Sequence, residues 1–224
     1  SAVISEQRSQ TQRMMTSADG SLEEFSLFAL DYEEDRHFFL AQYFRDQYDF
    51  AVATYPYINT AVQITRVEVW VTNRNAQTNN VRNLVALQDL GETNADQVRL
   101  DDLSPNFFTA SSVSGYPDNK ANQLSPEQLG SGILTNDIRD IATTRNGFGT
   151  LSGTVQEGID YAVLESARKL ESTDYTLHPK LGYISLRQRL NNDEILAVAF
   201  QYTVGGQTFQ VGEFAGDGVP SSST

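Results

Sequence analysis

Hydrophobic and polar positions change their spacing sharply within one run of the chain, residues 36–74. In the first half of this run apolar side chains recur every three or four residues, at Leu40, Phe44, Tyr48, Ala51 and Tyr55. That spacing places them on one face of an α-helix. Pro56 ends the pattern, because proline disfavours helical geometry at the residue before it. The pattern predicts one main amphipathic helix over residues 36–55.

The second half of the run changes to a spacing of two. Its alternating positions are Thr65, Val67, Val69 and Val71 on one side and Arg66, Glu68, Trp70 and Thr72 on the other. Alternation of β-branched and polar side chains is typical of a half-buried strand. The polar cluster 73–80 predicts a turn, and residues 84–87 predict a second short strand.

The clearest pattern near the C-terminus is a hairpin. Leu196, Val198, Phe200 and Tyr202 alternate along one strand, and Gly205-Gly206 supplies the positive φ angles of a type I′ turn. Closing the turn there places Tyr202 opposite Phe209 and Phe200 opposite Val211, two large apolar pairs on one face. Shorter strand signals occur at 25–30, 161–164, 174–177 and 182–186.

Together these patterns predict a strand-rich α+β fold, an antiparallel β-sheet or β-sandwich with one main amphipathic helix. We divide the chain into a polar N-terminal tail (1–20), a lobe of helix and strands (21–92), a loop-rich segment with short helices (93–157), an antiparallel β lobe (158–216) and a linker (217–224). All five parts are also compatible with a single domain. Both ends read as linkers, so we expect a piece of a longer chain.

The loop-rich segment carries two helix-start signals. Ser125-Pro126-Glu127-Gln128 combines a capping serine with proline at the first helical position, and Thr135 or Asn136 could cap a second short helix. The glycine-rich stretch 146–153 reads as a mobile loop. It has no Lys-Ser/Thr after it, so it does not predict a phosphate site.

Charge and composition narrow the classes of function. Lysine and arginine number 16 against 29 acidic residues, a net charge of −13. This charge opposes binding to nucleic acid and to anionic lipid, which depends on basic clusters. The absence of cysteine excludes disulfides and thiolate metal sites. No apolar stretch approaches the roughly 18 residues of a membrane-spanning helix.

Candidate catalytic and metal-binding residues are sparse. His37 and His178 lie far apart in the sequence, and no GxSxG motif accompanies them, so structural roles are expected. The acidic run 31–35 lacks the alternate ligands and turn glycine of a calcium loop, and a solvated helix start is expected. Asp101-Asp102 is interpreted as a solvated pair. The sequence predicts no enzyme, no cofactor and no metal.

A carbohydrate-binding or carbohydrate-active β-sandwich module is the alternative class. Exposed aromatic residues such as Trp70, Tyr116 and Phe148 would suit stacking on sugar rings. A calcium-stabilised surface module is a third possibility.

Several long stretches together resemble one family. They are RHFFLAQYFRDQYD, ITRVEVWVTNR, NLVALQDLGE and LGYISLRQRLNNDEILAVAFQYT with the following GG and FQVGEF, within residues 36–92 and 174–214. The amino-acid sequences of these stretches are similar to those of the SprA/Sov family. Its members are very large outer-membrane proteins of Bacteroidetes, associated with gliding motility and type IX protein secretion. Residues 93–157 carry no recognised motif.

The resemblance implies a soluble piece of an outer-membrane translocon that contacts proteins and turns over no substrate. Expected partners are other translocon subunits, a plug protein and exported cargo proteins, with no nucleic acid. The expected location is the cell outer membrane, facing the periplasm, the pore lumen or the cell surface. Candidates for structural or partner-contact roles are Trp70, Phe39, Tyr43, Gly205 and Gly206.

Overall fold

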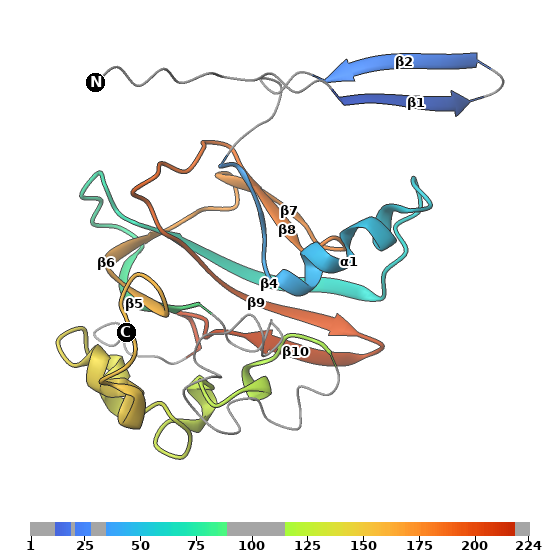
Figure 1. Ribbon diagram of the computed structural model, residues 1–224. Coiled ribbons are helices and arrows are strands. Elements are labelled where there is room, and N and C mark those ends of the chain that lie inside the picture. Colours follow the sequence, from blue (N-terminus) through green and yellow to red (C-terminus); the bar gives the residue numbers. More distant parts are fainter. Residues whose placement is uncertain (1–11, 19–20, 28–34, 89–114, 218–224) are drawn as a thin grey trace, which may run out of the picture.

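The computed structural model describes residues 12–18, 21–27, 35–88 and 115–217, and for the first two ranges the backbone alone (Figure 1). Within these ranges lie the strands β1 (Gln12–Ala18), β2 (Ser21–Leu27), β3 (His37–Phe39), β4 (Val62–Val71), β5 (Val81–Leu87), β6 (Tyr161–Lys169), β7 (Tyr175–His178), β8 (Tyr183–Leu186), β9 (Leu196–Val204) and β10 (Gln207–Val211). The helices are α1 (Gln42–Val52) and the 3-10 helices η5 (Asn119–Ala121), η6 (Pro126–Gln128), η7 (Asn136–Arg139) and η8 (Thr144–Leu151).

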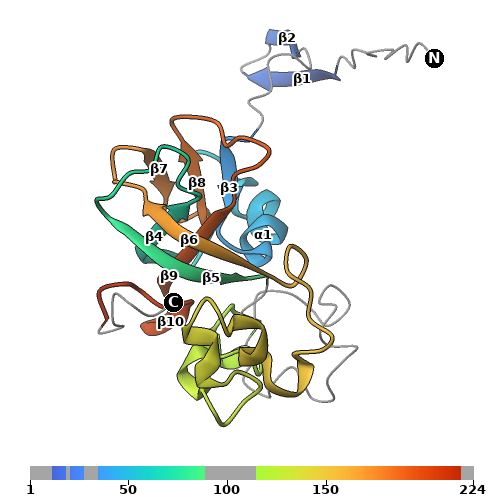
Figure 2. The same cartoon turned by 90° about the vertical axis from the view of Figure 1, so that its left-hand side faces the viewer.

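Two antiparallel sheets form the main body, which confirms the predicted strand-rich α+β fold. A five-stranded sheet has the order β10-β9-β4-β6-β5, and a small sheet has the order β3-β8-β7. Figure 2 shows the five-stranded sheet lying between the small sheet with α1, above it, and a group of 3-10 helices, below it. The division into the five predicted segments is not tested by this arrangement and stays a prediction.

The space between the two sheets holds the largest hydrophobic cluster, here called the sandwich core. It joins buried side chains of β4 and β9 to Ile184 and Leu186 of the small sheet and to Leu40 and Phe44 beside and on α1. Phe200 and Tyr202 are fully buried there, and Phe44 packs edge-on against both rings. Burial of apolar area of this kind is the main stabilising term of the fold.

The hairpin prediction is confirmed. β9 and β10 pair through Tyr202–Phe209 and Phe200–Val211, and the turn residues Gly205 and Gly206 have φ angles of 56° and 85°. The strand signals at 161–164, 174–177 and 182–186 correspond to β6, β7 and β8.

The predicted helix 36–55 is too long at its start. Residues 37–39 form β3 and pair with β8, and the α-helix begins at Gln42. Phe44 and Ala51 are buried as predicted, whereas Tyr55 lies beyond the helix and is 79% exposed. Leu40 lies between β3 and α1 and is buried in the same core as Phe44, so the spacing of these two residues did not reveal where the helix begins.

Strand β4 differs from the half-buried strand that its alternation predicts. A bulge lies between Ile64 and Arg66, so Ile64 is buried and Thr65 is exposed. On the other side Glu68 and Trp70 are buried as well, with 5% and 7% exposure. The strand is therefore covered on both sides over residues 68–71, which a simple alternation of polar and apolar residues does not indicate.

Near the N-terminus, residues 12–18 were expected to belong to a polar tail. They form β1, which pairs antiparallel with β2 from Gln12–Leu27 to Ala18–Ser21. The predicted strand at 25–30 overlaps the end of β2. The acidic residues 31–34 and the pair Asp101-Asp102 lie outside the described residues.

Residues 115–158 form a compact unit with a core of its own, here called the 3-10 lobe. Its buried residues include Leu124, Leu134, Phe148 and Val155, and they pack on Tyr161 of β6 and on Val85 and Leu87 of β5. The stretch 146–153 is thus no open loop, since Phe148 is fully buried. Helices do start near Ser125 and Thr135, but neither side chain caps its helix.

Candidate interaction site and buried polar network

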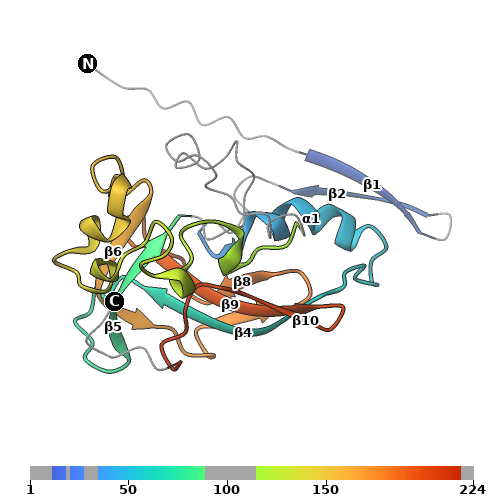
Figure 3. The same ribbon diagram turned by 90° about the horizontal axis from the view of Figure 1, so that it is seen from below.

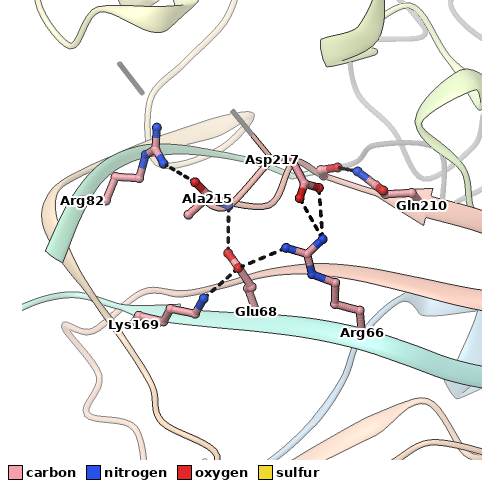
Figure 4. A network of polar contacts seen from close by, with 8 residues as sticks. Arg66, Glu68, Arg82, Lys169, Gln210, Ala215 and Asp217 are labelled. Atoms are coloured by element: carbon pink, nitrogen blue, oxygen red, sulfur yellow. Dashed lines mark hydrogen bonds and ion pairs between the residues drawn. The ribbon is translucent and has the colours of Figure 1, made fainter. Parts of the chain in front are cut away.

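A buried carboxylate on the central strand of the five-stranded sheet organises a polar network. Glu68 Oε1 accepts a hydrogen bond of 2.7 Å from Lys169 Nζ, and Oε2 accepts one of 3.0 Å from the backbone N–H of Ala215 (Figure 4). Arg66 adds an ion pair at 3.8 Å. Lys169 reaches Glu68 because it lies on β6 directly opposite Trp70 of β4. The sequence gives no signal for this contact, since Glu68 reads as one of several outward polar residues.

Arg66 connects the same network to the segment that follows β10. Its Nη1 donates to both carboxylate oxygens of Asp217, at 2.9 and 3.1 Å, and its guanidinium lies 3.8 Å from the centre of the Phe214 ring. A guanidinium over an aromatic face is stabilised by the ring quadrupole. Phe214 is fully buried beneath it.

Further contacts fix the backbone of residues 212–217. The side-chain amide of Asn119 both donates to Gly212 O and accepts from Gly212 N, at 3.0 and 2.7 Å. Gln210 Nε2 donates to the same carbonyl, and Arg82 Nη1 donates to Ala215 O. Segment 212–217 is thereby held against β4, β5 and the 3-10 lobe. We call this network the strap anchor.

The charge state of Glu68 follows from these contacts. Burial by itself raises the pKa of a carboxyl group, but the hydrogen bonds from Lys169 and Ala215 and the charges of Lys169 and Arg66 outweigh it. The pKa of Glu68 is therefore lowered, and the residue is an ionised acceptor whose two oxygens are both engaged. A group in this state anchors structure and does not exchange protons near neutral pH.

The two histidines meet on the outer side of the small sheet. His37 on β3 and His178 on β7 flank β8, where His37 Nδ1 is 2.8 Å from Ser185 Oγ and the His178 ring stacks on Tyr183 with centroids 4.1 Å apart. Burial and the nearby charge of His37 lower the pKa of His178. Sequence reasoning missed this meeting, because residues 36–41 were assigned to a helix.

The Ser185–His37 pair lacks the surroundings of a nucleophile. In acyl-transfer sites the backbone N–H after the serine points at the developing oxyanion. Here the N–H of Leu186 donates to Arg36 O at 2.7 Å, because β8 is the central strand of its sheet. The pair is a cross-strand hydrogen bond of the sheet.

The predicted contact residues are spread over the molecule. Trp70 is buried, Tyr43 is half-buried and Phe39 is 37% exposed. Phe39 packs edge-on against Tyr48 and Tyr183, and Tyr43 packs against Phe44 and Tyr116. Gly205 and Gly206 form the exposed tip of the β9–β10 hairpin. Contact of these residues with a partner stays a prediction.

Of the three aromatic residues proposed for sugar stacking, two are buried. Trp70 is 7% exposed and Phe148 is fully buried, while Tyr116 is half-buried beside Phe209. The carbohydrate alternative requires exposed rings at Trp70 and Phe148. This requirement is not met, because Ala215 of segment 212–217 packs against Trp70 and Phe148 lies in the core of the 3-10 lobe.

A different aromatic group is exposed and was missed from the sequence. Phe50, Tyr55 and Tyr57 are 62%, 79% and 79% exposed, more than any other large apolar residue of the described ranges. We call these three residues the aromatic tip. The signal for it was the position of Phe50 off the apolar face of the predicted helix and of Tyr57 beyond its end.

Other classes of site find little support in the described ranges. No three histidine, aspartate or glutamate side chains gather there as metal ligands. No helix in those ranges has the length and apolar character required to span a bilayer. A cavity of about 340 Å³ lies between the sheet and the 3-10 lobe, lined by Trp70, Ala197, Leu134 and Ile138 together with the bidentate pair Arg139–Glu213.

These features define a sheet domain with an internally anchored C-terminal segment and an exposed aromatic tip. Comparison with protein families identifies the family to which this domain belongs. A model of the SprA_N family, described as motility related/secretion protein, matches residues 3–191. The chain belongs to this family, and this membership confirms the resemblance to SprA/Sov proteins. The family is not a known enzyme family. No match is found among curated proteins.

Proposed function

We propose that this chain is a non-catalytic, protein-contacting domain of a large outer-membrane secretion channel, one that exports cargo proteins and supports gliding motility. The observation that carries the proposal is the family match over residues 3–191 to motility related/secretion proteins. The type IX system of Bacteroidetes, with other translocon subunits, a plug protein and exported cargo as partners, is the specific setting proposed.

The geometry agrees with a structural and contacting role. Both buried carboxylates of the described part have structural contacts: Glu68 holds segment 212–217, and Asp160 accepts a hydrogen bond from the backbone N–H of Gln156. The Ser185–His37 pair has its neighbouring backbone N–H committed to the sheet. The three most exposed large apolar side chains of the described part, Phe50, Tyr55 and Tyr57, are aromatic, and aromatic residues are enriched at protein interfaces.

The test is deletion in the full-length parent protein. Removing residues 1–224, with the rest of the parent retained, is expected to abolish cargo export and gliding while the channel still reaches the membrane. Export is measured as cargo in the culture medium, and channel assembly by its abundance in isolated membranes. Normal export with the domain removed would contradict the proposal.

A further inference from the structure

The cavity between the five-stranded sheet and the 3-10 lobe has a volume of about 340 Å³. Figure 2 shows the lobe below the sheet, and in Figure 3, which is seen from below, the lobe overlaps part of that sheet. Strands β5 and β9 line one side of the cavity, residues between 126 and 139 of the lobe line another, and residues 211–215 line a third. Pockets that bind small molecules have volumes of roughly 300–1,000 Å³, so the cavity is large enough for a ligand.

Small apolar side chains make room for the cavity. The alanines that line it are Ala86 of β5, Ala197 and Ala199 of β9, and Ala215 of segment 212–217. Strands that face a core are normally rich in larger β-branched and aromatic residues, which would fill this space. The lobe side carries Leu129, Leu134 and Ile138. An apolar lining of this kind favours an occupant that is itself largely apolar.

The lining contains one polar group without a hydrogen-bond partner, the indole N–H of Trp70. Trp70 is 7% exposed and lines the cavity, and its N–H donates to no residue of the described ranges. Lys169 lies over the ring, 5.7 Å from its centre, but an ammonium group is no acceptor. A buried tryptophan N–H normally has an acceptor, so this donor suits a ligand that supplies one.

The surroundings of the Trp70 ring place this donor at the cavity. The side chains that pack against its hydrophobic cluster include Leu84, Ala86, Ala197 and Ala215, and all four line the cavity. Among the described residues, the side-chain atoms that are fully enclosed without a partner belong to Asn122, Ser125 and Thr135. The indole nitrogen is not one of them, so it retains accessible surface. The cavity is the space on which the ring borders, and a ligand there reaches the N–H.

The charged residues of the lining are engaged with the protein itself. Arg139 and Glu213 form a bidentate pair, in which Arg139 Nη2 donates to Glu213 Oε1 at 2.6 Å. Arg82 Nη1 donates to Ala215 O at 3.1 Å. These three are the charged residues that line the cavity within the described part of the chain. Because a charge without a counter-charge is costly in an apolar space, the lining favours an uncharged ligand.

We propose that the cavity binds a small, uncharged and largely apolar molecule whose carbonyl oxygen accepts a hydrogen bond from the indole N–H of Trp70. An apolar cavity of about 150 Å³ in another protein binds benzene. The present cavity has about twice that volume, which suits a molecule of two fused rings. The site belongs to the folded domain and does not rest on the proposed role in secretion.

The first experiment uses the single tryptophan of the chain as a reporter. In the NMR spectrum of the nitrogen-15-labelled 224-residue chain, the one indole N–H signal belongs to Trp70. The protein is titrated with 2-acetylnaphthalene, a neutral two-ring ketone. We expect a saturable shift of this signal with a dissociation constant below about 1 mM. An indole signal that does not move up to the solubility limit of the ketone overturns the proposal.

Two matched ligands test the chemistry of the site. In 2-isopropenylnaphthalene a methylene group replaces the carbonyl oxygen and the shape is kept. It is expected to bind about three- to tenfold more weakly than the ketone and to leave the indole proton upfield of its position in the ketone complex, because the hydrogen bond is missing. The charged analogue 2-naphthoate is expected to bind at least about tenfold more weakly than the ketone. Equal affinities of ketone and alkene, or tighter binding of the carboxylate, contradict the proposed ligand class.

Filling the cavity from the sheet side tests where the ketone binds. Ala197→Leu places a larger side chain in the cavity and is expected to weaken binding at least about tenfold. Ala86→Leu makes the same test from β5, so the result does not depend on one variant folding. Ala142→Leu is the matched control at an exposed position of the 3-10 lobe and is expected to change affinity less than about twofold. Thermal unfolding shows which variants are folded, and wild-type affinity in a folded cavity variant would place the ligand elsewhere and refute the proposal.

Removing the donor separates its role from that of the apolar walls. Trp70→Phe keeps an aromatic ring and loses the N–H, so the preference for ketone over alkene is expected to disappear. Affinities for this variant are measured by saturation-transfer NMR on the ligands, because the indole signal is lost with the residue. A preference for the ketone that persists in Trp70→Phe rules out Trp70 as the donor and overturns the proposal.

Discussion

The sandwich core and the 3-10 lobe pack on the same five-stranded sheet, yet the sequence encodes them in different ways. In the sandwich core, apolar residues recur with the period of the strands and of α1, and side chains point where their spacing predicts except at the bulge between Ile64 and Arg66. In the 3-10 lobe, Leu124, Leu134, Phe148 and Val155 are equally buried but follow no constant period. Where the backbone is a regular strand or helix, the spacing of apolar residues predicts which side chains are buried. Short 3-10 helices have no such constant spacing, so in the 3-10 lobe the sequence shows which residues are apolar but not which are buried.

Truncating one buried aromatic ring in each region tests whether the sandwich core and the 3-10 lobe unfold together or separately. Phe200→Ala in the sandwich core and Phe148→Ala in the 3-10 lobe both remove fully buried rings, and each is expected to cost about 3–5 kcal/mol. Chemical denaturation gives the free energies of unfolding. Hydrogen exchange then separates the regions: Phe200→Ala is expected to accelerate exchange throughout, and Phe148→Ala mainly within 115–158. Global acceleration by Phe148→Ala would mean that the lobe and sheets unfold as one unit.

The close approach of Gly182 to Phe44 gives the next largest effect. Gly182 precedes β8 with φ of +67°, and an added Cβ would overlap the Phe44 ring. Gly182→Ala therefore combines backbone strain with overpacking, together about 2–4 kcal/mol. Gly158→Ala is the matched control, because Gly158 has a φ of +83° with open space around it and loses only the backbone component. The two melting temperatures should differ by several degrees, and equal values would refute the packing of α1 on this turn.

Glu68 shows why a buried polar network escapes a reading of the sequence. Arg66, Glu68 and Trp70 alternate with valines. A strand with one solvent-exposed face has the same pattern, so the pattern does not show that this side is covered. The burial of Glu68 and Trp70 depends on segment 212–217, which lies about 150 residues away in the chain. The partners are therefore set by the tertiary fold. By contrast, the β9–β10 pairs were predictable, because Gly205-Gly206 is adjacent to both strands and local turn geometry determines the register.

The same contrast explains the errors at the small sheet. Strand β3 has three residues, too few for an alternation to be recognised, and its partner β8 lies 148 positions away at the His37–Ser185 contact. The meeting of the two histidines follows from that pairing. The aromatic tip was missed for a related reason: the sequence shows that Tyr55 and Tyr57 are aromatic, and only the path of the turn shows that they are exposed.

Replacing the buried carboxylate probes the strap anchor that lies between the two regions. Glu68→Gln keeps the shape but removes the charge, and it is expected to cost about 1–3 kcal/mol at pH 7, because Lys169 and Arg66 lose their counter-charge. Asp193→Asn, which loses the exposed ion pair with Arg74, is the control and should cost less than about 1 kcal/mol. Equal costs would mean that the network contributes no more than a surface pair.

The stability that Glu68→Gln loses is expected to depend on pH in one direction. The pKa of Glu68 is lowered in the folded protein, so its stabilisation is fully present above the unfolded value of about 4.3 and is lost as the pH falls through the folded pKa. Melting temperatures of wild type and Glu68→Gln are therefore expected to converge in the acidic range below about pH 4.3. A gap that stays constant down to acid pH would exclude a charge-dependent role for the carboxylate.

The smallest change in stability is expected at the tip of the β9–β10 hairpin. There the structure is determined by residues adjacent in the sequence, whereas the burial of Glu68 is determined by residues far apart in the sequence. Gly206 has a φ of 85° with open space around it, so Gly206→Val brings only the strain of a β-branched residue in the left-handed region, about 1–2 kcal/mol. Asparagine tolerates that region, and Gly206→Asn should cost only a few tenths of a kcal/mol. Because the turn sets the Tyr202–Phe209 pair, the valine variant should also speed amide exchange in β10 before it affects the 3-10 lobe. An unchanged melting temperature for Gly206→Val would show that packing of Tyr202 and Phe200 in the sandwich core, and not the turn, determines the register.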